Sequence, residues 1–396
     1  MADAAAAPSG PAFRAADLRV TAILYILTTL SMATVGVIVP FMGVISTRIG
    51  ASPAQLGLAI SLFSLPSALL AMMGGALIDR IGVRRSLALA GVVAVLGDLV
   101  LVNAPALWGI HMGLLLAGVA FAGISVAAPA AMVEMMEGPA RVRAMSFWST
   151  YAPTGYALGL LMAVPFGADV AWQGAVLVHL AIIGAATLLV PLLPARTAAS
   201  GTVARRGSPF ALLADPAIVR LAIAVALPNA ISYGVSLVAP SYLARVHDVG
   251  LALSSGTVAA AKIAAMMLGG VLIGHLLARN LSFRRLYVGL ALGGIAAQLL
   301  LFHPATPFAV AALALLAWLF AFGGMAGAAM AQLPVLIRDP ANTGLASGLV
   351  GQFISLASFA APPVYFGLVD WHAYWAIALV GLLVAIVVLP RAPVRD

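Results

Sequence analysis

Residues 75–85 of the chain read Gly75-Ala-Leu-Ile-Asp79-Arg80-Ile-Gly82-Val-Arg84-Arg85. Long apolar blocks flank this charged stretch on both sides. A glycine at 75 permits close helix approach, and a glycine at 82 permits a tight turn. The carboxylate of Asp79 can accept hydrogen bonds from a helix N-terminus or pair with an arginine. We therefore expect a structured polar loop between two apolar helices.

The rest of the chain has the composition of a membrane protein. It is 63% hydrophobic and only 8% charged over 396 residues, whereas a soluble domain is roughly 25% charged. A membrane-spanning helix needs roughly 20 apolar residues. The chain is therefore predicted to be an all-α polytopic protein of about twelve spans, lying near 20–45, 55–78, 86–104, 109–133, 144–165, 172–194, 217–242, 252–278, 286–302, 308–336, 343–366 and 373–390.

The net charge of +8 could suggest nucleic-acid binding, but the arginines stand singly or in small groups between apolar blocks. This distribution is typical of the loops of a membrane protein and not of a surface that binds phosphates. With both termini inside, only Arg48 and Arg245 fall in outer segments. The remaining arginines all fall in inner segments, as the positive-inside rule requires. We expect a multi-pass protein of the inner or plasma membrane with both termini cytoplasmic.

The two halves of the chain resemble each other at an offset of about two hundred residues. The matching features are Pro139-Ala140 with Pro340-Ala341, Ser146 with Ser347, and Phe166-Gly167 with Phe366-Gly367. Together they indicate a parallel duplication of six helices. The predicted organisation is a disordered tail over 1–19, six-helix bundles over 20–194 and 217–390, a central cytoplasmic loop over 195–216, and a tail over 391–396.

The loop at 75–85 resembles the signature loop of the major facilitator superfamily: a glycine, three residues, Asp-Arg, then a glycine and a basic pair. It also stands where that family has it, between the second and third helices. The resemblance implies a secondary transporter, built as two six-helix bundles, in which such a loop latches the halves in the outward-open state. The latch residues would be Gly75, Asp79, Arg80, Gly82, Arg84 and Arg85. The alternative is that the three arginines only fix topology.

Two further signatures, typical of proton-coupled drug exporters, match poorly. Those exporters usually carry an arginine in helix four, where this chain has Leu114 to Gly118 without one. Their fifth helix usually reads Gly-Pro-x-x-Gly-Gly, where this chain has Ala152-Pro153-Thr154-Gly155. Export of amphipathic compounds therefore stays an alternative to the transport of an anion.

Lys262 is the strongest candidate for substrate binding. It is the only lysine in the chain and lies about ten residues inside the predicted eighth span, roughly 15 Å from its start. A charge at that depth is expensive, and it suggests function by default. The alternative is a structural ion pair.

Other ionisable groups favour structural roles. Asp98 lies within the third span and His179 within the sixth, which resemble peripheral helices of the family fold. A structural role for Asp98, or a place near the outer interface, is at least as well supported as proton coupling, and His179 is expected to be a hydrogen-bonded structural residue. Glu134 and Glu137 close the fourth helix beside two arginines and are interpreted as solvated loop groups.

Aromatic and amide residues gather on the helices that should line a central cavity. The candidates for substrate contact are Tyr25, Trp148, Tyr151, Asn229, Tyr233 and Gln352. Each could instead be an interface aromatic or an interhelical hydrogen bond. Pro228-Asn229 is expected to break the seventh helix and free a carbonyl.

No enzyme motif, metal pair or cysteine appears in the sequence, so we expect no catalytic activity, cofactor or metal. The favoured interpretation is a monomeric secondary transporter of a small organic anion or polar metabolite, with a proton or an exchanged anion as the coupled species. A receptor or scaffold built on the same fold is the remote alternative.

Overall fold

The computed structural model describes residues 14–166, 172–194, 209–337, 343–368 and 370–390, with backbone only at 70–77, 79, 209–211, 334 and 343–345. Apart from connecting turns, these residues are helical, and no strand occurs among them. The elements in chain order are α1 (Ala15–Ile38), η1 (Val39–Phe41), α2 (Met42–Ile49), α3 (Pro53–Ile81), α4 (Val83–Val102), α5 (Leu107–Met135), α6 (Gly138–Trp148), α7 (Tyr151–Ala163), η2 (Val164–Phe166), α8 (Trp172–Thr187), η3 (Val190–Leu192), η4 (Pro209–Ala214), α9 (Pro216–Val246), α10 (Leu251–Ala260), η5 (Ala261–Ala265), α11 (Met266–Ala278), α12 (Phe283–Phe302), α13 (Phe308–Leu336), α14 (Thr343–Gly367) and α15 (Trp371–Val387).

Every predicted span coincides with a helix or a run of consecutive helices. Within the described residues, nine helical segments are long and apolar enough to cross a membrane. The other three predicted spans correspond to α3, to α15 and to the pair α6–α7. The prediction of one continuous helix over 144–165 was wrong, because the helix is interrupted by a turn at Ser149 and Thr150.

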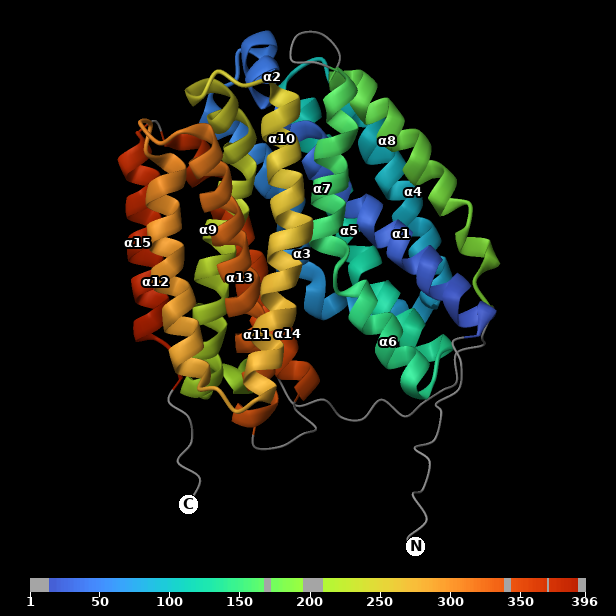
Figure 1. The fold of residues 1–396 in the computed structure, drawn as a ribbon. Helices are drawn as coiled ribbons and strands as arrows, with labels where there is room; N and C mark the ends of the chain where they lie inside the picture. Colours follow the sequence, from blue (N-terminus) through green and yellow to red (C-terminus); the bar gives the residue numbers. More distant parts are fainter. Residues whose placement is uncertain (1–13, 167–171, 195–208, 338–342, 369, 391–396) are drawn as a thin grey trace, which may run out of the picture.

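The helices form two groups, α1 to α8 and α9 to α15, which lie side by side (Figure 1). The first residues of α1 and the last residues of α15 lie at one end of the molecule, which we call the proximal end, and α2 lies at the opposite, distal end. Residues 195–208 of the predicted central loop lie outside the described residues, and η4 follows them before α9 begins.

Glycines allow very close contact between helices, both within a half and across the two halves. A Cβ at Gly159 of α7 would overlap the backbone oxygen of Ala33 in α1. A Cβ at Gly57 of α3 would lie 2.6 Å from the Cα of Pro363 in α14. The first contact holds the N-terminal half together and the second joins the two halves, as small residues commonly do between membrane helices.

The expected break in the seventh span is absent. Helix α9 runs without interruption through Pro228 and Asn229. The expected free carbonyl is present, however: a proline at 228 cannot donate to the carbonyl of Ala224, and the Tyr287 hydroxyl of α12 donates to that oxygen instead. The helix stays continuous because a neighbouring side chain satisfies the freed carbonyl.

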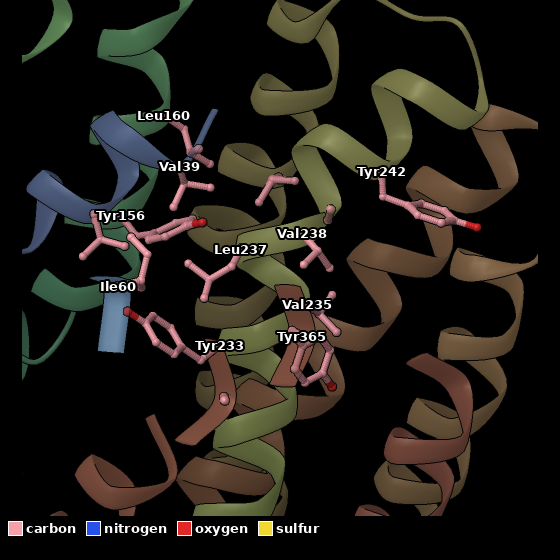
Figure 2. Packing of buried hydrophobic residues seen from close by; sticks show 14 of the residues in the cluster. Val39, Ile60, Tyr156, Leu160, Tyr233, Val235, Leu237, Val238, Tyr242 and Tyr365 are labelled. Carbon is pink, nitrogen blue, oxygen red and sulfur yellow. The ribbon is translucent and has the colours of Figure 1, made fainter. Parts of the chain in front are cut away.

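The two halves are tied together in the distal half of the molecule. The Tyr156 hydroxyl of α7 donates to the Ser236 carbonyl of α9 at 2.7 Å, and the Ser61 hydroxyl of α3 donates to the Phe359 carbonyl of α14 at 2.5 Å. Residues 231–240 of α9 are all buried in this region. Figure 2 shows Val39 of η1, Tyr156 and Leu237 gathered in one packed cluster. The cluster is continuous across the halves, so it closes this end of their interface.

The arginine distribution predicts that the proximal end is cytoplasmic. Cysteines introduced at Ser9 and Ser200 should therefore resist a membrane-impermeant thiol reagent in intact cells, because both positions fall in segments expected to be cytoplasmic. As a control, a cysteine at Ala305, which is exposed between α12 and α13, should react readily. The chain has no native cysteine, so each variant reports a single position. Rapid labelling of Ser9→Cys together with protection of Ala305→Cys would reverse the predicted topology.

Candidate functional site

A cavity of about 410 Å³ lies between the two halves, within the range of about 300–1,000 Å³ usual for small-molecule sites. Its walls come from α1, α3, α5 and α7 of the first half and from α9, η5, α11, α13 and α14 of the second. Of the six residues predicted to contact substrate besides Lys262, three lie on its wall: Tyr151, Asn229 and Tyr233. Lys262 lies there as well.

Lys262 is held in an unusual stretch of helix. Residues Ala261–Ala265 form a single π-helical turn, η5, between α10 and α11, a feature often found at functional sites. The side chain is only 7% exposed, and its Nζ lies 5.1 Å from the centre of the Tyr156 ring. Among the described residues, no carboxylate forms an ion pair with it. The structural ion pair considered as an alternative is therefore absent from the part of the chain described, and a cation–π contact is its recognisable partner.

Uncharged polar groups accompany Lys262 on the cavity wall. The Asn229 amide donates to the Ser358 hydroxyl at 2.9 Å, and both residues line the cavity. The hydroxyl oxygens of Ser67 and Ser232 are buried without a hydrogen-bond partner in the described structure. Buried polar atoms are normally paired, so these hydroxyls are available to water or to a bound molecule.

Aromatic rings line the opposite, N-terminal side of the cavity. Phe63 of α3 stacks on Phe121 of α5 with ring centres 5.2 Å apart. Tyr151 of α7 lies 6.2 Å from Phe121, and all three residues line the cavity. Of these three residues only Tyr151 was predicted from the sequence, because a phenylalanine in an apolar span carries no signal that separates a cavity wall from a helix interface.

Tyr25 and Trp148 lie between helices instead of on the cavity wall. The Tyr25 hydroxyl hydrogen-bonds with Thr150 and Thr154, at 3.0 and 3.1 Å. The indole N–H of Trp148 donates to the Thr28 hydroxyl at 3.1 Å. Both residues join α1 to the α6–α7 segment, which is the interhelical alternative considered for them. Gln352 of α14 also lies off the wall, with its side-chain oxygen buried and without a partner in the described residues.

The predicted latch lies at the proximal junction of α3 and α4. Asp79 and Arg80 fall in the last turn of α3, and Gly82 joins the helices with φ of 84°, a conformation that favours glycine. Arg84 and Arg85 begin α4. The Asp79 side chain and the surroundings of Gly75 lie outside what the structure describes, so the latch role remains a prediction.

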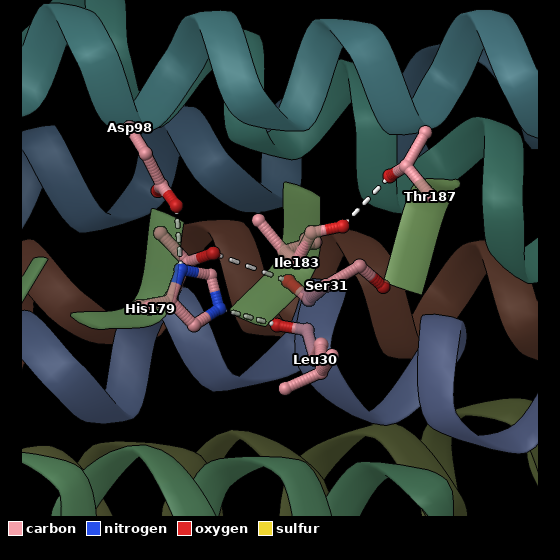
Figure 3. Close-up of polar contacts among 7 residues, drawn as sticks. Leu30, Ser31, Asp98, His179, Ile183 and Thr187 are labelled. Atoms are coloured by element: carbon pink, nitrogen blue, oxygen red, sulfur yellow. Dashed lines mark hydrogen bonds and ion pairs between the residues drawn. The ribbon is translucent and has the colours of Figure 1, made fainter. Parts of the chain in front are cut away.

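Asp98 and His179 form a buried pair away from the cavity (Figure 3). The Asp98 carboxyl and His179 Nδ1 are 2.6 Å apart, and each side chain is 1% exposed. His179 Nε2 lies 2.8 Å from the Leu30 carbonyl. The contacts tie α4 and α8 to α1, which confirms the expectation of a hydrogen-bonded structural histidine. Glu137 is the exposed N-cap of α6, and Glu134 lies in the last turn of α5.

The similarity of the chain to known proteins identifies its family. The family model described as the Major Facilitator Superfamily matches residues 24–362. The chain belongs to the major facilitator superfamily. It is a multi-pass membrane transporter of that group. No curated protein sequence matches it.

Solved structures show the same major facilitator fold. A bacterial homolog of the human lysosomal transporter Spinster, in an inward-facing and unoccupied conformation, superposes with a TM-score of 0.72 at 15% identity, covering 95% of each chain. A variant of the nucleoside transporter NupG superposes with a TM-score of 0.75 at 13% identity, covering 94% of this chain and 99% of the other. At such low identities the similarity shows only that the fold is shared. The substrate class has to be inferred from the residues that line the cavity.

Proposed function

We propose that this transporter carries a small organic anion or polar metabolite whose negative group binds Lys262. The observation that carries the proposal is a buried lysine on the cavity wall with no carboxylate partner among the described residues. An unpaired charge at this depth costs about 2.5–3.5 kcal/mol on insertion scales. A substrate anion would offset that penalty whenever the cavity is loaded.

The neighbouring polar groups complete the recognition of such a substrate. Asn229, Ser358 and Ser232 offer hydrogen bonds from α9 and α14, the helices that accompany η5 around the cavity. An anion would therefore meet several neutral dipoles and a cation that is largely buried, where electrostatic interactions are strong. The same geometry repels a cationic substrate.

Export of amphipathic compounds is the second candidate, because aromatic rings line one side of the cavity. A cationic drug in the cavity would be repelled by Lys262, because no carboxylate among the described residues forms an ion pair with this lysine. The fourth-helix arginine of the drug exporters is also missing between Leu114 and Gly118. The scaffold alternative gives no reason to keep a buried lysine on the wall of a cavity.

Alternating access explains how the two halves would move the substrate. The halves are packed together at the distal end, and the arginine distribution predicts that the proximal end is cytoplasmic. Both points support an inward-facing state, which is also the state of the Spinster homolog that superposes on this chain. The latch around Asp79 would then stabilise the opposite state. A proton or an exchanged anion would balance the transported charge.

A thermal-shift screen of the purified full-length protein tests this proposal. Each organic acid is paired with its neutral amide and with an amine of similar shape, so that charge is the only large difference. Acids should raise the apparent melting temperature and be taken up by proteoliposomes, because only they can pair with Lys262. If amines or amides stabilise the protein and the acids do not, the anion proposal fails and export of amphipathic compounds becomes the favoured function.

A further inference from the structure

The cavity is chemically two-sided. Its C-terminal side carries Lys262 and Asn229, together with Tyr233 and Phe322. Its N-terminal side carries the mutually contacting rings of Phe63, Phe121 and Tyr151, together with the hydroxyls of Ser64, Ser67 and Ser125. The cation therefore lies on one side of the cavity, and the group of three contacting rings lies on the other.

The aromatic side is a fixed surface. Phe121 lies between Phe63 and Tyr151, and Tyr151 also lies 4.7 Å from Trp148. Trp148 is itself anchored by its hydrogen bond to Thr28. Rings from α3, α5, α6 and α7 thus hold one another in place. A preformed aromatic surface favours a planar, unsaturated ligand, because ring pairs contribute about 0.5–1.5 kcal/mol beyond the burial of area.

We infer that the transported anion is an aromatic carboxylate, with its ring against Phe121 and Tyr151 and its carboxylate at Lys262. This inference rests on the proposed function and narrows it to one chemical class. A molecule with one flat apolar end and one anionic end matches both sides of the cavity at once. Acids without a ring would satisfy Lys262 alone.

Three probes of similar shape test separately whether the substrate is an anion and whether it is aromatic: benzoate, cyclohexanecarboxylate and benzamide. Affinities for the purified full-length protein are measured by calorimetry. Benzoate should bind about 2- to 13-fold more tightly than cyclohexanecarboxylate, the range that corresponds to the ring-pair contribution. Benzamide, which keeps the ring and loses the charge, should bind more weakly than either acid.

Phe121→Leu and Tyr151→Leu should each reduce the preference for benzoate over cyclohexanecarboxylate, and the double variant should abolish it, while the affinity for cyclohexanecarboxylate stays within about 2-fold. Phe308→Leu, at the start of α13 and outside the cavity, is the matched control and should retain the preference. If both acids bind equally to the native protein, the aromatic assignment fails and the anion proposal stands. If benzamide binds better than both acids, the anion proposal itself fails.

A second inference concerns the closed distal end and rests on different observations. In a helix, a proline cannot donate to the carbonyl four residues before it. Pro240 leaves the Ser236 carbonyl free in this way, and Pro363 leaves the Phe359 carbonyl free. Those two oxygens are the acceptors of the hydrogen bonds from Tyr156 and Ser61 that join the halves.

We propose that these proline-freed carbonyls are the docking points of the distal gate. Each bond joins a hydroxyl of one half to a backbone oxygen of the other, so it can break and re-form as the halves rock. The helix that carries the acceptor keeps its other backbone bonds in both states. Water can take over the carbonyl when the gate opens, because no helical N–H competes for it.

The rate of labelling of a cavity cysteine from the distal side tests the gate. The reporter is Ser67→Cys, on the cavity wall in a chain without native cysteine. Adding Tyr156→Phe together with Ser61→Ala should increase that rate at least several-fold, because each hydrogen bond is worth about 0.5–1.5 kcal/mol. Tyr242→Phe, which removes a hydrogen bond to Phe302 within the second half, is the matched control and should leave the rate unchanged. Equal rates in the gate and control variants would overturn the proposal.

Discussion

Lys262→Met is expected to abolish anion-dependent stabilisation and anion uptake while the protein remains folded. Methionine nearly preserves the length and flexibility of the side chain, so the change removes the charge and keeps the packing. Hydrogen bonds to charged groups contribute about 1.5–3 kcal/mol, so we expect affinity for the anion to fall about 10- to 150-fold. Isothermal binding and proteoliposome uptake of a carboxylate identified in the screen measure the effect.

The stability of the Lys262→Met variant without ligand separates a binding role from a structural one. Breaking a buried ion pair destabilises a protein by about 3–5 kcal/mol, whereas removing an unpaired buried charge should leave the apparent melting temperature unchanged or raise it. Lys262→Arg should keep part of the affinity. Ile263→Met, which alters an exposed neighbour in the same π-helical turn, should behave like the native protein. A large loss of stability in Lys262→Met would indicate that the lysine is structural.

Asp98→Ala is expected to reduce the stability of the folded protein by about 3–5 kcal/mol, because it leaves His179 buried without its partner. The contacts dictate how protons are shared. His179 Nε2 faces the Leu30 carbonyl at 2.8 Å, so it must carry a hydrogen. Nδ1 then either donates to an ionised Asp98 or accepts from a protonated one. The pair is neutral overall in both cases, which explains how it tolerates complete burial.

Conservative variants make this prediction specific. The side-chain amide introduced by Asp98→Asn could donate to a neutral His179, so the substitution should cost about 1 kcal/mol or less. The double variant Asp98→Leu with His179→Leu should be far more stable than the sum of the single changes predicts, because the two residues act as one unit. Apparent melting temperatures at one heating rate measure all of these proteins. Equal losses in Asp98→Asn and Asp98→Ala would contradict this account of the pair.

The pair also bears on proton coupling. It lies off the cavity wall with both side chains 1% exposed, so no route for a proton to the substrate is apparent in the described residues. Asp98→Asn should therefore leave the pH dependence of transport unchanged. A shift in that dependence in a stable Asp98→Asn protein would return Asp98 to the coupling mechanism.

The sequence by itself determined the number of spans and the family. Apolar length is a local property, since each span needs only its own run of side chains to enter lipid, and every predicted span has its helix. The position of the loop at 75–85 and the depth of Lys262 in its span could also be predicted, because both depend only on the local sequence. The prediction of helix breaks was wrong in two places, because the same residue types can either interrupt a helix or be accommodated within it. Ser149 and Thr150 interrupt the fifth span, whereas Pro228 leaves α9 continuous because Tyr287 takes up the carbonyl.

Only the tertiary structure decided which residues face the cavity and which groups pair. Asp98 and His179 are 81 residues apart, and Ser61 meets Phe359 across 298 residues. In soluble helices an apolar stripe would show which face is buried. In a membrane helix lipid and protein interior are equally apolar, so Tyr25 and Tyr151 cannot be told apart until neighbouring helices are packed against them. Packing placed Tyr25 between helices and Tyr151 on the cavity wall.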